Sequence, residues 1–142
     1  MNNPTVQEIV NELDAKVLFG AAHLNNQTGS FSVGAMQLRN YLLHLKENSL
    51  VITPGDRADI ILGALQANES LNYPTISGIV LTGNIVPEDS ILKLIEGLST
   101  IVPIIAVEEG TYFITNKIGS IKSKIYANNK QKIKISIATF EK

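Results

Sequence analysis

Cysteine is absent from the 142-residue sequence, and no apolar run approaches the ~18 residues that a membrane-spanning helix requires. Disulfides, thiolate metal sites and cysteine nucleophiles are therefore excluded. An excess of one charge is also lacking, because twelve basic side chains stand against thirteen acidic ones. The resulting net charge of −1 gives no electrostatic signature for nucleic acid or an anionic membrane. The first residues lack the pattern of a signal peptide, so a cytoplasmic location is expected.

Motifs of independent catalysis are scarce as well. No stretch matches the phosphate loop G-x-x-x-x-G-K-[ST] or the dinucleotide fingerprint G-x-G-x-x-G. The two histidines, His23 and His44, have no acidic partner at the spacing of a metal site or a catalytic triad. The sequence therefore predicts no catalytic residues, no metal and no cofactor. A free-standing enzyme is the weakest of the functions considered.

The pattern of apolar residues, by contrast, is regular. Hydrophobic residues make up 44% of the chain, and its length fits one domain over residues 1–142. We expect this domain to be cut from a longer chain. Three apolar strands separated by helices of about three turns predict a parallel sheet covered by helices. The expected strands are 16–19, 31–33, 50–53, 76–82 and 104–107; the expected helices begin near residues 6, 36, 58, 87 and 111. Thr5 and Glu8 have the spacing of a capping box for the first helix, and Gly78 within a strand indicates a close backbone approach. Residues 130–137 fit either an edge strand or a helix, and helix is preferred.

Two turns carry the most information. The run Thr53-Pro54-Gly55-Asp56-Arg57 ends one predicted strand, and Thr82-Gly83-Asn84 ends the next. The carboxyl ends of parallel strands lie at one edge of the sheet, which is where open α/β sheets bind ligands. The spacing therefore predicts that the two turns are neighbours at that edge.

The first turn has two interpretations. In the structural one, Pro54-Gly55 forms a tight turn and the Asp56 carboxylate caps the following helix, which stabilises it by ~1 kcal/mol. In the functional one, Arg57 binds an anion, because a cation beside the positive end of a helix dipole otherwise gains nothing. That anion is either a ligand or a carboxylate from another loop.

The second turn and the third strand end have the same double interpretation. Gly83 and Asn84 tolerate positive φ and suit a plain turn, but exposed amides with Thr82 would also form an anion-binding nest. The third strand is followed by Glu108-Glu109-Gly110-Thr111-Tyr112. Tyr112 offers either a surface for base stacking or, as is preferred, a contact with a partner subunit.

These residues resemble a known signature. Asp56-Arg57 and Thr82-Gly83 match the DRTGG motif, and the wording of residues 33–36, 50–57, 78–83 and 102–104 is similar to the middle domain of long bacterial phosphate acetyltransferases. The likeness spans residues 6–140. It departs at Asn84, where the signature has a second glycine; asparagine can adopt the αL conformation, so we expect the turn to survive.

The resemblance implies a fold and a context. The fold is a three-layer α/β/α sandwich with a mostly parallel, mixed sheet, similar to the N-terminal domain of HPr kinase/phosphorylase. Acetyl transfer between coenzyme A and phosphate would take place in another domain of the parent enzyme. Related modules accompany nucleotide-sensing CBS domains in other proteins, which favours a regulatory role by analogy.

The leading hypothesis is a non-catalytic regulatory and oligomerisation domain that senses a small anionic metabolite or nucleotide and contacts neighbouring domains of the parent enzyme. Tyr112 and Phe113 are the predicted interface for self-association, as a dimer or larger assembly. The alternatives are a ligand-free structural spacer and a sensor module of a CBS-containing protein. The predicted ligand-binding residues are Thr53, Gly55, Asp56, Arg57, Thr82, Gly83, Asn84 and Thr111.

Overall fold

A five-stranded mixed sheet forms the centre of the computed structural model, which describes residues 3–99 and 101–124. Its strand order is β1-β5-β4-β3-β2. Strands β2 to β5 run parallel, and β1 joins the edge antiparallel to β5. The strands are β1 (Lys16–Phe19), β2 (Ser30–Val33), β3 (Ser49–Pro54), β4 (Ile76–Thr82) and β5 (Ile104–Ala106).

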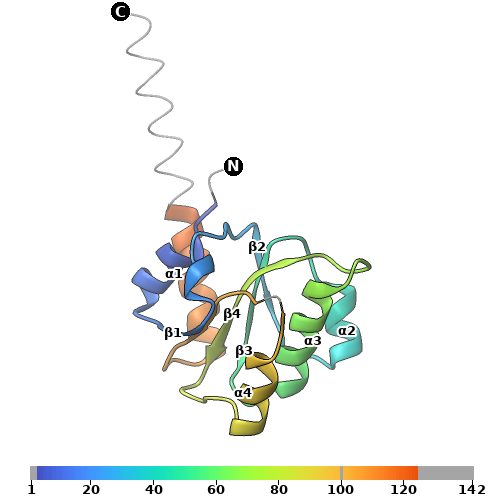
Figure 1. Ribbon diagram of the computed structural model, residues 1–142. Coiled ribbons are helices and arrows are strands. Elements are labelled where there is room, and N and C mark those ends of the chain that lie inside the picture. Colours follow the sequence, from blue (N-terminus) through green and yellow to red (C-terminus); the bar gives the residue numbers. More distant parts are fainter. Residues whose placement is uncertain (1–2, 100, 125–142) are drawn as a thin grey trace, which may run out of the picture.

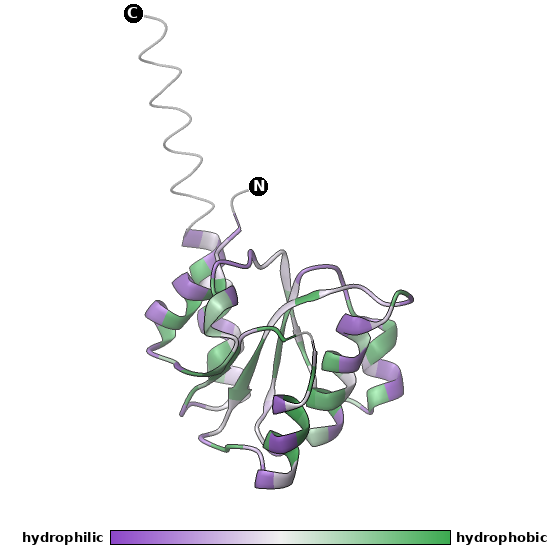
Figure 2. Ribbon diagram, viewed as in Figure 1, coloured by the Kyte–Doolittle hydropathy of each residue, from purple (hydrophilic) through white to green (hydrophobic). Residues whose placement is uncertain are grey.

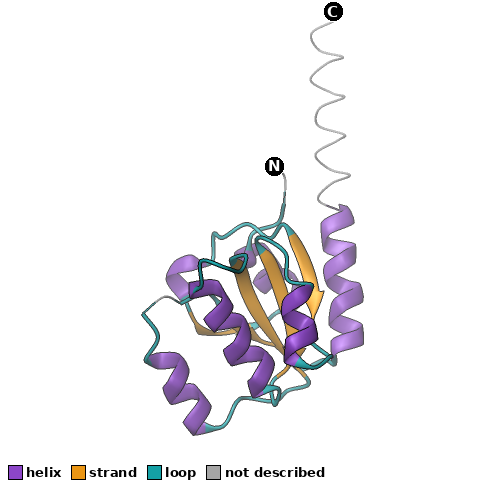
Figure 3. Cartoon of the chain, turned by 90° about the vertical axis from the view of Figure 1, so that its right-hand side faces the viewer, coloured by secondary structure: helices purple, strands orange, loops and turns teal. Residues whose placement is uncertain are grey.

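Helices cover both faces of this sheet (Figures 1 and 3). Labelled helices are α1 (Val6–Leu13), α2 (Leu38–Leu43), α3 (Ala58–Glu69) and α4 (Asp89–Glu96), and a further helical segment runs over 111–124. In Figure 1, α2 and α3 lie on the right of the sheet and α4 lies at the bottom, whereas α1 and the orange helix of 111–124 lie on the left. The predicted three-layer α/β/α sandwich with a mixed sheet is confirmed.

Each face of the sheet has its own hydrophobic core. Alternate strand residues point to opposite faces, so Leu50 and Ile52 join one core while Val51 joins the other. Figure 2 shows hydrophobic residues on the strands and on the helix sides that face them. The core shared with α1 and segment 111–124 includes Val6, Ile9, Leu13, Ile114, Ile118 and Ile121.

Local signals in the sequence correspond to features of the fold. Thr5 and Glu8 form the predicted capping box at the start of α1. A Cβ on Gly78 would lie 3.0 Å from the Pro103 carbonyl oxygen, so this strand glycine does mark a close backbone approach. The predicted strand 76–82 has the observed bounds of β4. The predicted helix over 130–137 lies outside the described residues.

The connections between the strands determine which face of the sheet each helix covers. The chain passes through β2, β3, β4 and β5 in spatial order, and α2, α3 and α4 between them all pack in one core. Only after β5 does the chain cross to the other face, where segment 111–124 packs with α1. None of the helices in the described part of the chain is long and apolar enough to cross a membrane.

Candidate functional site at the carboxyl edge of the sheet

The two signature turns do lie side by side. Strands β3 and β4 are parallel neighbours, with Pro54 opposite Thr82, so both turns leave the same edge of the sheet. The Gly55 amide donates to the Thr82 carbonyl oxygen over 3.2 Å. A Cβ on Gly55 would lie 1.7 Å from the carbonyl oxygen of Ile85. The first turn therefore needs glycine because the backbone after β4 packs directly on it.

The second turn is held to the end of β5. Gly83 has φ 83° and Asn84 has φ 56°, so asparagine does adopt the left-handed conformation that the turn requires. The Gly83 amide donates to the Glu109 carbonyl at 2.7 Å, and the Asn84 amide donates to the Val107 carbonyl at 3.1 Å. In this conformation the two amides serve the fold, and neither is directed at a ligand.

Hydroxyl groups connect the same turns. The buried Thr53 hydroxyl donates to the Gly34 carbonyl oxygen at 2.9 Å, which ties the ends of β2 and β3 together. The hydroxyls of Thr82 and Thr111 are hydrogen-bonded to each other at 2.7 Å, which ties β4 to segment 111–124. The hydroxyl groups of these three predicted ligand residues thus join neighbouring ends of the sheet to one another or to the following helix.

Arg57 finds its anion within its own helix. Its guanidinium donates two hydrogen bonds to the Asp59 carboxylate, each 3.0 Å, and one to the Met36 carbonyl oxygen at 2.8 Å. The hydrogen bonds from Arg57 lower the pKa of Asp59, despite the opposing effect of desolvation. Because one side of the guanidinium pairs with Asp59, an incoming anion would compete with this carboxylate.

The predicted helix cap at Asp56 is wrong. The N-cap of α3 is Arg57, which makes no side-chain capping bond, and Asp56 is exposed. Asp59 is the acid in the first turn of α3, and nearby backbone amides help to lower the pKa of its carboxyl group. An acid inside the first turn complements the helix dipole as well as a cap residue does.

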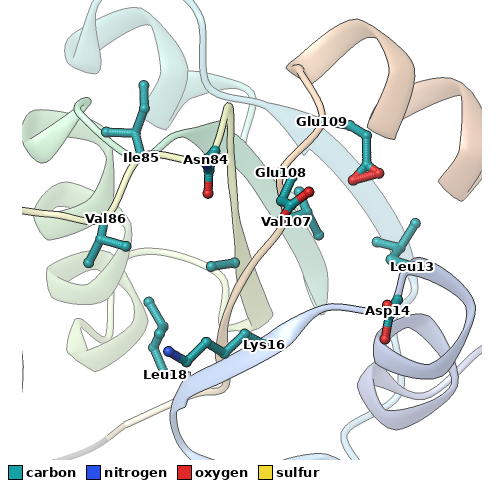
Figure 4. A pocket seen from close by; sticks show the side chains of 11 residues that line it. Leu13, Asp14, Lys16, Leu18, Asn84, Ile85, Val86, Val107, Glu108 and Glu109 are labelled. Atoms are coloured by element: carbon teal, nitrogen blue, oxygen red, sulfur yellow. The ribbon is translucent and has the colours of Figure 1, made fainter.

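A hollow of about 340 Å³ lies beside the second turn (Figure 4). Three parts of the chain enclose it: the loop after β4, the segment after β5 and the end of α1 with the start of β1. Its lining consists of Leu13, Asp14, Lys16, Leu18, Asn84, Ile85, Val86, Ala106, Val107, Glu108 and Glu109.

Topology explains the place of this hollow. The chain leaves β4 toward α4 on one face of the sheet and leaves β5 toward segment 111–124 on the other. Two adjacent parallel strands whose connections diverge in this way leave a crevice at their carboxyl ends, which is where open sheets bind ligands. The pair β4 and β5 is such a point. The signature turn after β3 lies one strand away from it.

The charges around the hollow are mostly negative. Asp14, Glu108 and Glu109 stand against Lys16, the one basic residue among the described residues that line it. Figure 4 shows Lys16 extending from β1 toward Leu18 and Val86, with Asp14 and Glu109 on the side of α1. Such a lining can pair one anionic group through Lys16, but it repels a ligand with several negative charges.

A smaller hollow of about 260 Å³ lies on the other side of the loop after β4. It touches the first signature turn through Gly55 and Asp56, and its remaining wall is mostly apolar. Ile85 and Val86 line both hollows, so this loop separates them. A shift of the loop would change both hollows at once.

The predicted interface residues are exposed. Tyr112 is 76% and Phe113 53% accessible, at the start of segment 111–124. The Lys117 ammonium lies 5.8 Å from the centre of the Phe113 ring, which suits a cation–π contact. Exposed aromatic side chains are compatible with a partner surface, and the interface stays a prediction.

Several residues of the hollow escaped sequence reasoning. Lys16 and Asp14 were not expected near the signature, because nothing in the sequence shows that β1 pairs with β5 in antiparallel register, with Lys16 opposite Ala106. Glu108 and Glu109, by contrast, belong to the third strand end, which the sequence did place at this edge. Within residues 3–99 and 101–124, no three His, Asp or Glu side chains are grouped as a metal site requires.

With this geometry described, the comparisons define the class of domain. A family model for the DRTGG domain matches residues 8–121. The chain belongs to the DRTGG domain family.

Relatives in that family give a more specific context. The chain is 37% identical over 143 residues to a phosphate acetyltransferase of Nitratidesulfovibrio vulgaris and 43% identical over 137 residues to one of Synechocystis sp.. These matches cover 100% and 96% of this chain but 20% of each relative. The chain therefore spans about one fifth of the length of the acetyltransferases that it resembles.

A solved structure shares the fold. It contains the CBS and DRTGG domains of the regulatory region of a Clostridium perfringens pyrophosphatase, in complex with the activator diadenosine tetraphosphate. The TM-score is 0.59 at 21% identity, and the match covers 80% of this chain and 45% of that one.

Proposed function

We propose that this chain is a non-catalytic regulatory domain of a cytoplasmic phosphate acetyltransferase. The parent enzyme would interconvert acetyl-CoA plus phosphate and acetyl phosphate plus CoA. The supporting observation is that nearly the whole chain aligns with only one fifth of those relatives, which leaves the other four fifths to carry the acetyl transfer. Identities of 37% and 43% with the acetyltransferases, against 21% with the CBS-containing pyrophosphatase, favour this parent over a CBS protein.

The regulatory ligand would bind in the 340 Å³ hollow between β4, β5 and β1. The hollow lies at the crevice where connections from adjacent strands diverge, and its size falls within the range of small-molecule sites. The charged side chains that line the hollow favour one kind of anionic effector over others. Lys16 can pair with one anionic group, while Glu108 and Glu109 can accept hydrogen bonds from hydroxyl or amino groups. A small acid with a single negative charge suits this lining better than a polyphosphate.

Regulation would act through the loop after β4. An effector shifts an enzyme between conformations only if it contacts those conformations differently. Ile85 and Val86 lie between the two hollows, and the Ile85 backbone packs on Gly55. A ligand beside β5 would press on this loop and change its contact with the first signature turn. The pyrophosphatase, whose regulatory region pairs a DRTGG domain with an activator, supports the role by analogy.

Calorimetric titration of the chain with pyruvate-type acids, acetyl phosphate and nucleotides tests the proposal. We expect a singly charged acid to bind and Lys16→Gln to weaken its binding about tenfold, because the pairing cation is lost. Lys93→Gln, on the exposed side of α4, removes the same charge away from the hollow and should leave the affinity unchanged. No heat with any acid in the panel, or equal binding by both variants, would contradict this site.

In the intact acetyltransferase, the same effector should change the KM or kcat, and Lys16→Gln should abolish that response. Loss of binding to the isolated chain without loss of regulation in the full enzyme would place the regulatory site elsewhere.

Self-association is a second function, supported by the exposed Tyr112 and Phe113. Sedimentation should show a dimer or larger species, and the double change Tyr112→Ser, Phe113→Ser should convert it to monomer. Leu43→Ser on α2 is the control, because Leu43 is also exposed but lies on the opposite face of the sheet. A monomer at all attainable concentrations would rule out this function for the chain.

A further inference from the structure

A third hollow, of about 360 Å³, lies at the opposite edge of the sheet, where the parallel strands begin. The segments before β2, β3, β4 and β5 meet there with the last turn of α3. We call it the amide hollow, because four of its side chains are carboxamides. Its lining consists of His23, Asn26, Gln27, Asn48, Asn68, Thr75, Ile76, Ser77, Ile101 and Val102.

The lining of the amide hollow contains no Asp, Glu, Lys or Arg among the described residues. This sets it apart from the 340 Å³ hollow at the carboxyl edge, whose lining includes four charged side chains. A charged ligand gains no pairing partner here, whereas a neutral ligand that can both donate and accept hydrogen bonds meets matching groups. Ile76, Ile101 and Val102 add an apolar surface.

Two of the carboxamides are fixed to consecutive residues of β4. The Asn26 Nδ2 donates to the Ser77 carbonyl oxygen at 3.3 Å, and the Asn68 Oδ1 accepts from the Ile76 amide at 2.9 Å. These partners determine how each side-chain amide is turned. A carbonyl can only accept, so Nδ2 of Asn26 must face it; a backbone amide can only donate, so Oδ1 of Asn68 must face it.

These bonds also determine which atom of each side-chain amide is left free. Asn26 offers Oδ1 as an acceptor, and Asn68 offers Nδ2 as a donor; no hydrogen bond within the described part of the chain uses either atom. Because both side chains are already held by the backbone, a ligand need not immobilise them on binding. The hydrogen bond between Thr28 and Ser77, 3.2 Å and buried, holds the same wall.

We propose that the amide hollow binds a nucleobase, with any attached sugar or phosphate directed to solvent. A nucleobase is planar and apolar on its faces, and it carries a donor next to an acceptor on its edge. Asparagine recognises adenine in this way, through the N6 amino group and a ring nitrogen. Here the N6 amino group would donate to Asn26, and the ring nitrogen would accept from Asn68.

Asn68→Asp is the sharpest variant. Aspartate keeps the oxygen that accepts from Ile76, so the wall stays in place, but it replaces the free donor with an acceptor. NMR titration of the chain with adenosine should then show binding at least tenfold weaker than in the parent chain. Asn40→Asp, exposed on α2, adds the same charge far from the hollow and should bind adenosine normally. Unfolding curves of both variants check that the fold is intact.

The ligand can be varied in parallel. Purine riboside, which lacks the N6 amino group, should bind about tenfold more weakly than adenosine, because Asn26 then has no donor to accept from. Adenosine and AMP should bind about equally, because no Lys or Arg side chain among the described lining residues can pair with the phosphate. Adenosine shifts confined to other residues, equal binding of adenosine to Asn68→Asp, or a preference for AMP that Lys16→Gln removes would each overturn the proposal.

Discussion

At the carboxyl edge of the sheet, neighbouring turns are joined by backbone hydrogen bonds, by threonine hydroxyls and by the direct packing of Ile85 on Gly55. At the amino edge, backbone hydrogen bonds also join neighbouring segments, since Gly29 donates to Asn48 and Asn48 donates to Thr75. There, however, the start of β4 is held in addition by the side-chain carboxamides of Asn26 and Asn68. The signature residues belong to the first edge. Contacts made by backbone leave little room for substitution, whereas contacts made by side-chain tips can be exchanged. The difference suggests that much of the signature is explained by the joining of four strand ends.

The strongest test of this contrast is Gly55→Ala. The new Cβ would overlap the Ile85 carbonyl oxygen, and the loop after β4 must move to admit it. We expect a loss of about 3 kcal/mol in the free energy of unfolding, measured by urea denaturation. Gly119→Ala is the matched control, because its Cβ would meet only the Phe31 ring at 3.8 Å in a helix, and it should stabilise by about 0.5–1 kcal/mol. Similar stability in both variants would show that the packing of Ile85 on Gly55 does not restrict substitution at the carboxyl edge.

Thr53→Val should have the next largest effect. The change preserves shape but deletes the donor to the Gly34 carbonyl in a fully buried place, so a loss of about 1.5–2 kcal/mol is expected by denaturation. Thr115→Val makes the same chemical change where the hydroxyl only bonds a carbonyl of its own helix, and it should cost less than about 0.5 kcal/mol. If the two variants lose equal stability, the hydrogen bond between the ends of β2 and β3 contributes no more to stability than one within a helix.

Arg57→Met should cost less than about 1 kcal/mol, because the pair with Asp59 is partly exposed. Since Arg57 lowers the pKa of folded Asp59, the pair stabilises the fold above the ordinary carboxyl pKa and loses that contribution as pH falls through the lowered value. Wild type and variant should therefore differ at neutral pH and converge in acid, and the Asp59 pKa seen by NMR should rise in the variant. Arg39→Met, exposed on α2, serves as the comparison. A difference that persists unchanged in acid would assign the role of Arg57 to its bond with Met36.

Asn26→Ala should have the smallest effect, about 0.5 kcal/mol, since it removes one long, half-buried hydrogen bond at the amino edge. Thermal unfolding measures it. A loss as large as that of Gly55→Ala would mean that the two edges are equally fixed.

Much of the fold could be predicted because its signals are local. Apolar runs gave the strands, the capping box at Thr5 gave the start of α1, and the polar turns gave the shared edge of β3 and β4. The pairing of β1 with β5 could not be predicted, because it depends on contacts between residues about ninety positions apart that leave no spacing pattern.

The candidate site was harder to predict than the fold. The positions of Gly55, Gly83 and Asn84 followed from their turns, but their backbone amides donate to carbonyl groups at the ends of other strands or just beyond them. Arg57 illustrates the difficulty: a cation at a helix start predicted an anion from a ligand or from another loop, whereas the carboxylate that it binds is Asp59, two residues further on in the same helix. The sequence patterns show which groups are polar, and only the packing shows which of them are already bonded.

The order of the strands has a consequence for synthesis on the ribosome. Each of β3, β4 and β5 pairs with the strand made just before it, so the sheet can grow one strand at a time as the chain emerges. Strand β1 is the exception, because its partner β5 is the last of the described strands to be made. Strand β1 must therefore stay without a strand partner while the rest of the sheet assembles, and the 340 Å³ hollow, which Lys16 helps to enclose, is completed last.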